Sequence, residues 1–156
     1  MFRIGYVPGA FDLFHIGHLN ILRQAKENCD YLIAGVSSDD VLIQHKGVTP
    51  VVPLLERLEI VRNIRYVNMA HAAMTNDKIE IWKELRFNVL FKGDDWRGTE
   101  KGSKLEHDFA EVGVDVIYFP YTKATSSSAL RRTLQNIDAI ATRARTIATL
   151  KTAIAA

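Results

Sequence analysis

The chain has 156 residues, a length typical of one domain with a sizeable hydrophobic core. Apolar residues make up 47% and charged residues 24%, a balance typical of a globular protein in water. The formal net charge of +2 suits a small anionic ligand, but the sequence lacks the clustered basic stripe of a nucleic-acid-binding protein. We therefore expect a small-molecule partner and no nucleic acid.

Two features bear on the compartment of the protein. Cys29 is the single cysteine, which excludes an intrachain disulfide and a cysteine-based zinc cluster and favours a buried structural thiol. The N-terminal segment lacks the charge pattern of a signal peptide, and no apolar run approaches the roughly 18 residues that span a bilayer. The sequence therefore predicts a cytoplasmic protein without membrane contact.

Short β-rich runs alternate with helical stretches along the chain. We expect strands at 2–7, 30–38, 66–74, 88–93 and 114–120. We expect helices at 18–29, 54–64, 77–86 and 102–113. Residues 39–53 are predicted to form a long polar loop, because glycine and prolines interrupt them. The chain is predicted to be helical again from Ser126, and residues 137–156 to form a helical tail or linker after a domain of residues 1–136.

This alternation predicts an α/β protein, with a Rossmann-like, doubly wound parallel sheet of five strands and a C-terminal helical tail. In such a fold, ligands bind beyond the carboxyl ends of the strands. Polar segments follow four of the expected strands, namely "PGAFDLFHIGH", "SSDD", "GDDW" and "PYTKATSSS". Their convergence at one edge of the sheet predicts the ligand site.

The segment "GAFDLFHIGH" (9–18) places His15 and His18 around Gly17, where the first helix begins. Gly9 allows backbone to approach a ligand closely. A helix N-terminus attracts anions, and two imidazoles there can donate hydrogen bonds to phosphate oxygens. A zinc site is the weaker interpretation, because no further ligands follow at a suitable spacing. A histidine that only caps the helix is the structural alternative.

Two further segments have residues that suit binding of phosphates or of a nucleoside. In "TKATSSSALRR", Thr125 and Ser126 lie at a helix start, where hydroxyls and free amides can hold phosphates as well as cap the helix. Either Arg131 or Arg132 could point toward the phosphates or into solvent. In "GDDW", the glycine permits close approach and the next three residues offer acceptors and a ring to a nucleoside, unless they form only a turn with an aromatic cover.

The "HIGH" segment after a first strand resembles the signature of the nucleotidyltransferase superfamily. Together with "RYVN" (65–68), "GDDW" (93–96) and "TSSS" (125–128), it resembles the glycerol-3-phosphate and ethanolamine-phosphate cytidylyltransferases from about Phe2 to Leu134. This resemblance implies the HIGH nucleotidyltransferase fold. It also implies transfer of CMP from CTP to a small phosphorylated or phosphonate alcohol, such as glycerol 3-phosphate. Pyrophosphate would leave, Mg²⁺ would bind mainly through the triphosphate, and the protein would be a homodimer.

The resemblance also implies roles for individual residues. His15, His18 and Lys46 would be catalytic, with Lys46 reaching both the α-phosphate and the second substrate; as a plain sequence feature it is an ordinary loop lysine. Arg57 and Arg65 would bind substrate, the Arg65 region also forming the dimer contact. The implied nucleotide-binding residues are Gly9, Ala10, Phe11, Asp12, Gly93, Asp94, Asp95, Trp96, Thr122, Thr125, Ser126 and Ser127.

Three departures from the family pattern leave the second substrate open. Ala10 replaces a threonine, Asn68 replaces an aspartate, and Tyr121 stands where the glycerol-phosphate enzymes carry an arginine. The last change favours the ethanolamine-phosphate type. An adenylyltransferase that uses ATP on a sugar phosphate or pantetheine phosphate is the near alternative. A nucleotide sensor without catalysis and a tRNA-binding protein are the alternatives of other classes, the latter suggested by "HIGH" together with "KGSKL" (101–105).

Overall fold

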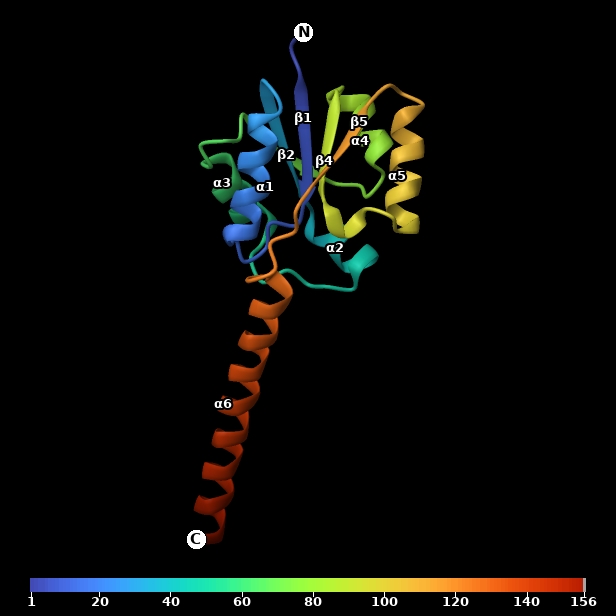
Figure 1. The fold of residues 1–156 in the computed structure, drawn as a ribbon. Coiled ribbons are helices and arrows are strands. Elements are labelled where there is room, and N and C mark those ends of the chain that lie inside the picture. The colour runs from blue at the N-terminus through green and yellow to red at the C-terminus, as the bar shows by residue number, and fades with distance from the viewer. Residues whose placement is uncertain (156) are drawn as a thin grey trace.

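The computed structural model describes residues 1–155, which form a parallel five-stranded sheet with helices on both faces (Figure 1). The strands lie in the order β3-β2-β1-β4-β5. Their bounds are β1 Ile4–Gly9, β2 Tyr31–Ser37, β3 Met69–Ala73, β4 Val89–Gly93 and β5 Asp115–Phe119. The helices are α1 Ile16–Glu27, α2 Asp39–Lys46, α3 Leu54–Arg62, α4 Lys78–Leu85, α5 Glu100–Ala110 and α6 Ser127–Ala155, with a 3-10 turn η1 at Asp94–Trp96. The predicted Rossmann-like sheet is confirmed.

Two hydrophobic clusters hold the helices against the sheet. On one face, Leu22 and Ala25 of α1 and Val61 of α3 pack against the central strands. On the other face, Ile81 of α4 and Phe109 of α5 pack on the side chains that point the opposite way. The sheet is thus covered on both sides, as its nearly continuous apolar strands require.

The neighbouring strands β1 and β4 separate toward their carboxyl ends. β1 pairs with β2 along its whole length, from Ile4 to Gly9, but it pairs with β4 only at Gly5 and Tyr6. Strands β2 and β3 lie on one side of β1, whereas β4 and β5 lie on the other side. The direction in which successive strands are added therefore reverses between β1 and β4. Ligand crevices in doubly wound sheets form at this reversal point. The carboxyl ends of β1 and β4 are therefore where a ligand site is expected.

The prediction of a continuous loop over residues 39–53 is wrong. Residues 39–46 form α2, which Ser38 caps by accepting a hydrogen bond from the Val41 amide and which Gly47 ends in the left-handed conformation. Val41 and Leu42 are buried, and their packing gives this short helix its stability. The true loop is limited to residues 47–53. The first helix also starts two residues earlier than expected, at Ile16.

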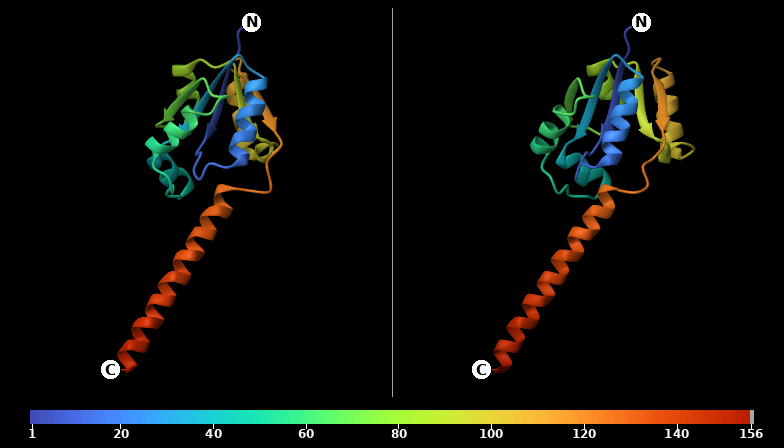
Figure 2. Two further views of the ribbon diagram at one scale, coloured as in Figure 1. Left: turned by 90° about the vertical axis from the view of Figure 1, so that its left-hand side faces the viewer. Right: turned by 60° about the vertical axis from the view of Figure 1, so that its left-hand side comes forward.

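The predicted helical tail is confirmed as part of α6. This helix runs without a break across residues 136 and 137, contains no buried residue, and projects from the carboxyl edge of the sheet (Figures 1 and 2). The division between a domain of residues 1–136 and a tail therefore does not coincide with a break in the helix. Within residues 1–155, no helix combines the length and the apolar character that crossing a bilayer would need.

Candidate active site

Two histidine rings lie side by side where α1 begins. The Nδ1 atom of His15 accepts a hydrogen bond from the Gly17 amide at 3.0 Å, and Nδ1 of His18 accepts one from the His15 amide at 3.2 Å. The ring centroids are 4.0 Å apart. Because Nδ1 is an acceptor in both rings, the neutral imidazoles carry their protons on Nε2. The histidines therefore cap the helix and keep two N–H donors for a ligand.

The environment keeps His18 uncharged. Burial, and then the neighbouring His15, lower the pKa of His18 to about 3, while Asp12 acts in the opposite direction. The ring packs between Phe11 and Phe14, with centroid distances of 5.4 Å and 5.3 Å. Burial also lowers the pKa of His15. At neutral pH both rings are thus neutral donors in fixed orientations.

The loop before α1 depends on two glycines and on strained backbone. A methyl group on Gly17 would lie 2.8 Å from the His15 ring, and one on Gly9 would lie 2.9 Å from the Phe11 ring. Phe11 and Leu13 have positive φ angles of 52° and 49°, a conformation that costs bulky residues energy. Such strain is concentrated at functional sites, where the surrounding structure holds it in place.

Asp12, which we expected to bind nucleotide, is fully buried and turned into the protein. Its carboxylate accepts hydrogen bonds from the amides of Val51 and Val52, both at 2.9 Å, and from Arg131 at 2.8 Å. Burial alone raises the pKa of Asp12, but the two amides and Arg131 outweigh it and hold the pKa below its usual value. The carboxylate thus joins the β1–α1 loop to residues 51–52 and to α6.

The substrate contact expected for Arg57 does not agree with its position, because its side chain is fully buried. Its guanidinium donates to the carbonyls of Val52, Ala10 and Ser37 at 2.8, 2.5 and 2.8 Å, and it forms a 2.6 Å ion pair with Asp39. The Ala10 carbonyl follows β1 and the Ser37 carbonyl ends β2, while the Val52 carbonyl precedes α3. Arg57 therefore positions the rim of the crevice.

Arg65, also expected to bind substrate, lies outside the crevice. It is exposed and stacks on Tyr66, with its guanidinium carbon 5.4 Å from the ring centroid. The nearby Asn68 amide donates to the Leu32 carbonyl at the start of β2, which places this segment at the amino edge of the sheet. The Asn68 side chain accepts from the Leu32 amide and from Lys26.

The loop before α6 lies against the start of α1, as the convergence of polar segments predicts. The Asn20 side chain donates to the Thr122 hydroxyl at 3.2 Å, and the Ser127 hydroxyl donates to the Asp12 carbonyl at 2.6 Å. Ser126 caps α6 by accepting from the Ala129 amide. The first amides of α6 have no partner within the helix, and Thr125 lies half-buried beside them. Arg131 turns inward to Asp12.

The "GDDW" segment follows β4 on the other side of the crevice. A methyl group on Gly93 would lie 2.6 Å from the Asp95 carboxylate, so any larger residue would displace that side chain. Asp94 accepts a hydrogen bond from the Tyr121 amide at 3.0 Å, which joins this turn to the loop before α6. Asp95 is exposed at the rim.

A cavity of about 660 Å³ opens beside the ends of β1 and β2, on the face of the sheet that α4 and α5 cover. Gly9 and Ser37 line it, together with five lysines and the Trp96 ring. Those lysines are Lys46 from α2, Lys78 from α4, Lys92 from β4, and Lys101 and Lys104 from α5. Our sequence interpretation missed Lys78 and Lys92, although Lys92 is the one charged residue in the expected strand 88–93.

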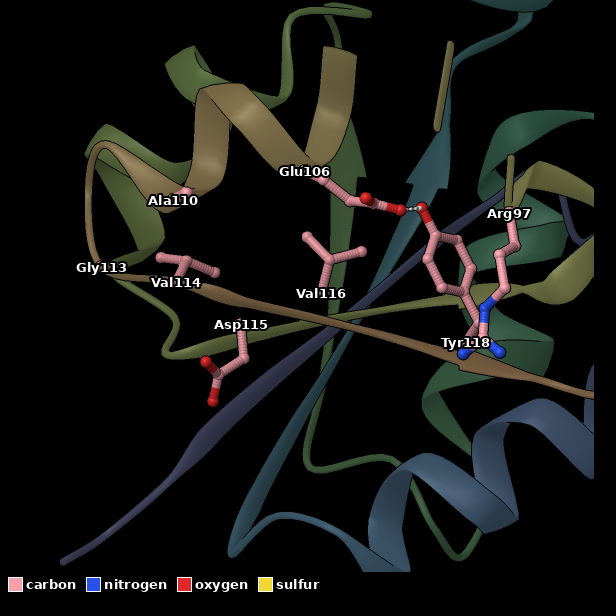
Figure 3. A pocket seen from close by; sticks show the side chains of 8 residues that line it. All are labelled: Arg97, Glu106, Ala110, Gly113, Val114, Asp115, Val116 and Tyr118. Carbon is pink, nitrogen blue, oxygen red and sulfur yellow. Dashed lines mark hydrogen bonds between the residues drawn. The ribbon is translucent and has the colours of Figure 1, made fainter. Parts of the chain in front are cut away.

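Burial, followed by repulsion from neighbouring cations, lowers the pKa values of Lys46, Lys78 and Lys92. Burial, and then the charges of Lys78 and Lys46, lower the pKa of Lys92 to about 7. Burial and Lys46 lower the pKa of Lys78, while burial, Lys101 and Arg131 lower that of Lys46. A further cavity lies along the outer strand β5, where Glu106 accepts a 2.6 Å hydrogen bond from Tyr118, and it contains none of the expected site residues (Figure 3).

We predict that Lys92→Met stabilises the ligand-free protein at pH 7. The pKa of Lys92 is about 7 when folded and 10.5 as its ordinary value, so its charge destabilises the fold below pH 7 and this cost vanishes as pH rises toward 10.5. We expect Tm to rise by about 3 °C or more at pH 7 and the gain to shrink toward pH 10. Lys83→Met on the exposed side of α4 is the control, and a lowered Tm for Lys92→Met would contradict the analysis.

We predict that Arg57→Met destabilises the fold by about 3–5 kcal/mol, because it leaves three partly buried carbonyls and Asp39 without their donor. The exposed Arg62, paired with Glu59 at 3.2 Å, is the matched control. Its replacement by methionine should cost no more than about 1 kcal/mol. Urea unfolding measures both, and equal small losses would show that the buried network is not structural.

Comparison with known proteins places this arrangement in a family. Residues 6–133 match the family model described as cytidylyltransferase-like. Ethanolamine-phosphate cytidylyltransferase of Dictyostelium discoideum is 42% identical over 98 residues, which are 60% of this chain and 26% of the relative. The chain thus spans about a quarter of that relative's length.

In two other comparisons, the alignment covers most of the matched protein. FAD synthase of Pyrococcus abyssi is 32% identical over 131 residues, which are 81% of this chain and 88% of that enzyme. The crystal structure of a lipopolysaccharide core biosynthesis protein from Thermoplasma volcanium shares the fold, with a TM-score of 0.67 at 22% identity, over 80% of this chain and all of that one. Since its motifs, its sheet and most of its length agree with this group, the chain belongs to the cytidylyltransferase-like family of nucleotidyltransferases.

Proposed function

We propose that this protein is a cytidylyltransferase, which transfers CMP from CTP to a small phosphorylated or phosphonate alcohol and releases pyrophosphate. The observation that carries the proposal is the pair of Nε2–H groups on His15 and His18, held beside the start of α6. Two oriented neutral donors next to two helix N-termini form a site for a polyphosphate. The match to ethanolamine-phosphate cytidylyltransferase supports this substrate class.

In the proposed reaction, an ionised oxygen of the acceptor attacks the α-phosphorus of the nucleotide. A new phosphorus–oxygen bond forms, the bond to the β-phosphate oxygen breaks, and pyrophosphate leaves with that electron pair. The acceptor oxygen is already deprotonated, so the protein needs to supply alignment and charge stabilisation rather than a base. His15 and His18 donate to the phosphate oxygens, while Lys46 reaches both the α-phosphate and the acceptor.

The remaining expected residues provide the other ends of the nucleotide site. The first amides of α6, with Thr125 and Ser126, would bind the β- and γ-phosphates, close to Thr122. The segment from Gly93 to Trp96 would lie against the nucleoside. Asp12 does not face the nucleotide in this proposal; it fixes the loop that carries the histidines.

Mg²⁺ fits this site as an ion that arrives with the triphosphate. Residues 1–155 contain no group of three histidine, cysteine or acidic side chains that could hold a metal ion. The exposed carboxylates of Asp94 and Asp95 could complete the coordination of an ion held mainly by phosphate oxygens. When bound, the ion would shield the negative charge of the triphosphate.

An adenylyltransferase is the second candidate. FAD synthase is named for an adenine dinucleotide, and this chain aligns with 88% of it. The choice of base rests on the contacts that "GDDW" makes with the ring. A nucleotide sensor without catalysis remains the alternative of another class. We further propose a homodimer, for which the exposed Arg65, with the partly buried Tyr66 beneath it, provides a contact outside the crevice at the amino edge.

We predict that the protein releases pyrophosphate faster with CTP than with ATP. The measurement is pyrophosphate release with each nucleotide and a panel of glycerol 3-phosphate, ethanolamine phosphate and hydroxyalkyl phosphonates. A clear preference for ATP would establish the adenylyltransferase instead. Tight nucleotide binding with no turnover of any acceptor would establish the sensor.

We predict that His18→Ala lowers turnover by about two to three orders of magnitude, because it removes one of the paired donors. His18→Asn is the matched variant, since its amide oxygen can replace Nδ1 as the acceptor for the His15 amide but supplies no Nε2–H. We expect both variants to lose similar activity and to remain folded by circular dichroism. Retained activity in His18→Asn would show that His18 acts only as a cap.

A further inference from the structure

Three lysine ammonium groups gather in the cavity on the α4 and α5 side of the sheet. Lys92 lies over the Trp96 ring with its ammonium 3.7 Å from the centroid, and the Lys78 ammonium is 5.8 Å from the same centroid. Lys46 lines the same cavity from the end of α2, and its charge lowers the pKa of both other lysines. The Trp96 ring thus lies beside the ammonium groups of Lys78 and Lys92, and the charge of Lys46 repels both.

Among residues 1–155, no carboxylate pairs within 4 Å with this lysine cluster, defined as Lys46, Lys78 and Lys92. The acidic residues that line the cavity have other partners: Asp77 caps α4, Asp108 pairs with Lys104 at 2.7 Å, and Glu111 lies 3.5 Å from His107. Asp77 attracts Lys78 without pairing with it. Asp95 attracts Lys46 and Lys92 without pairing with them. Clustered charges of one sign that have no paired carboxylate favour an anionic ligand.

The lysine cluster is separate from the proposed triphosphate site. His15, His18, Thr125 and Ser126 belong to the side of the crevice that α1 and α6 form, and none of them lines this cavity. The two regions meet at Gly9, the last residue of β1, which lines the cavity and precedes the histidine loop. An anion among the lysines and a triphosphate at the histidines would therefore approach each other at the carboxyl end of β1.

Resting on the proposed function, we propose that Lys78 and Lys92, with the Trp96 ring between their elements, form the subsite for the phosphate or phosphonate dianion of the acceptor. Lys46 lies where it can contact both this dianion and the nucleotide. The cavity of about 660 Å³ is large enough for a small alcohol or sugar that carries one such group. The subsite thus selects a small dianionic acceptor, and the remaining cavity walls select its organic part.

Inorganic phosphate is the probe for this subsite, and calorimetric titration is the measurement. We would titrate phosphate into the wild-type chain and into the double variant Lys78→Gln/Lys92→Gln, first alone and then with saturating CTP and Mg²⁺. Saturation with nucleotide occupies the triphosphate site, so the second titration reports on the acceptor subsite. Lys83→Gln, on the exposed side of α4, is the control for general loss of positive charge.

We expect the double variant to bind phosphate about ten-fold more weakly or worse in both titrations, since two charge-assisted contacts are lost. Its affinity for CTP should change by less than about three-fold. Where turnover is measured, the KM for the acceptor should rise while the KM for CTP stays constant. Unchanged phosphate affinity with CTP bound, or an equal loss of CTP affinity, would overturn the proposal.

The outcome is distinguishable from failure of the proposed function. If neither CTP nor ATP binds, the nucleotidyltransferase assignment fails, yet the phosphate titration of the free chain still tests the lysine cluster. If nucleotides bind and react but the double variant behaves like the control, the proposed function stands and the subsite is wrong. Thermal unfolding of each variant verifies that the comparison is made between folded proteins.

Discussion

The orientation of two imidazole rings is the constraint on which the active-site geometry depends. Each ring is fixed through Nδ1 by a backbone amide at the start of α1, so each presents its single proton on Nε2. Burial between aromatic rings keeps His18 neutral, so that it donates a hydrogen bond without carrying a charge of its own. A free histidine would divide its population between two tautomers and many orientations. Preorganised donors of this kind stabilise developing charge because they do not have to reorganise during the reaction.

Two buried charged groups hold this arrangement in place. Asp12 joins the histidine loop to residues 51–52 and α6, while Arg57 joins the ends of β1 and β2. The same region carries costs, including positive φ angles at Phe11 and Leu13 and the mutual repulsion within the lysine cluster. Proteins tolerate such local costs at functional sites because a ligand recovers them on binding. The distribution of strain and charge is thus consistent with a site built for a polyanion.

The sequence predicted the order of strands and helices, because apolar runs and helical periodicity are local properties. It also predicted that His15, Gly93 and Ser126 follow strand ends at one edge. It could not predict that Asp12 and Arg57 turn inward. The partners of Asp12 lie 39 or more positions away, and those of Arg57 are backbone carbonyls and Asp39, 18 positions away. The cap at Ser38 could have indicated α2, but the glycine and prolines later in the segment led to the prediction of a loop. Lys78 and Lys92 meet only through the packing of α4 beside β4, so their juxtaposition required the structure.

The most direct test of this account is nitrogen NMR of the histidine side chains at pH 7, with and without CTP and Mg²⁺. The account predicts that His15 and His18 are both neutral with the proton on Nε2, and that the resonances of both Nε2 atoms shift when the nucleotide binds. A proton on Nδ1 in either ring, or Nε2 chemical shifts that do not change when the nucleotide binds, would contradict the assignment of these groups as phosphate donors.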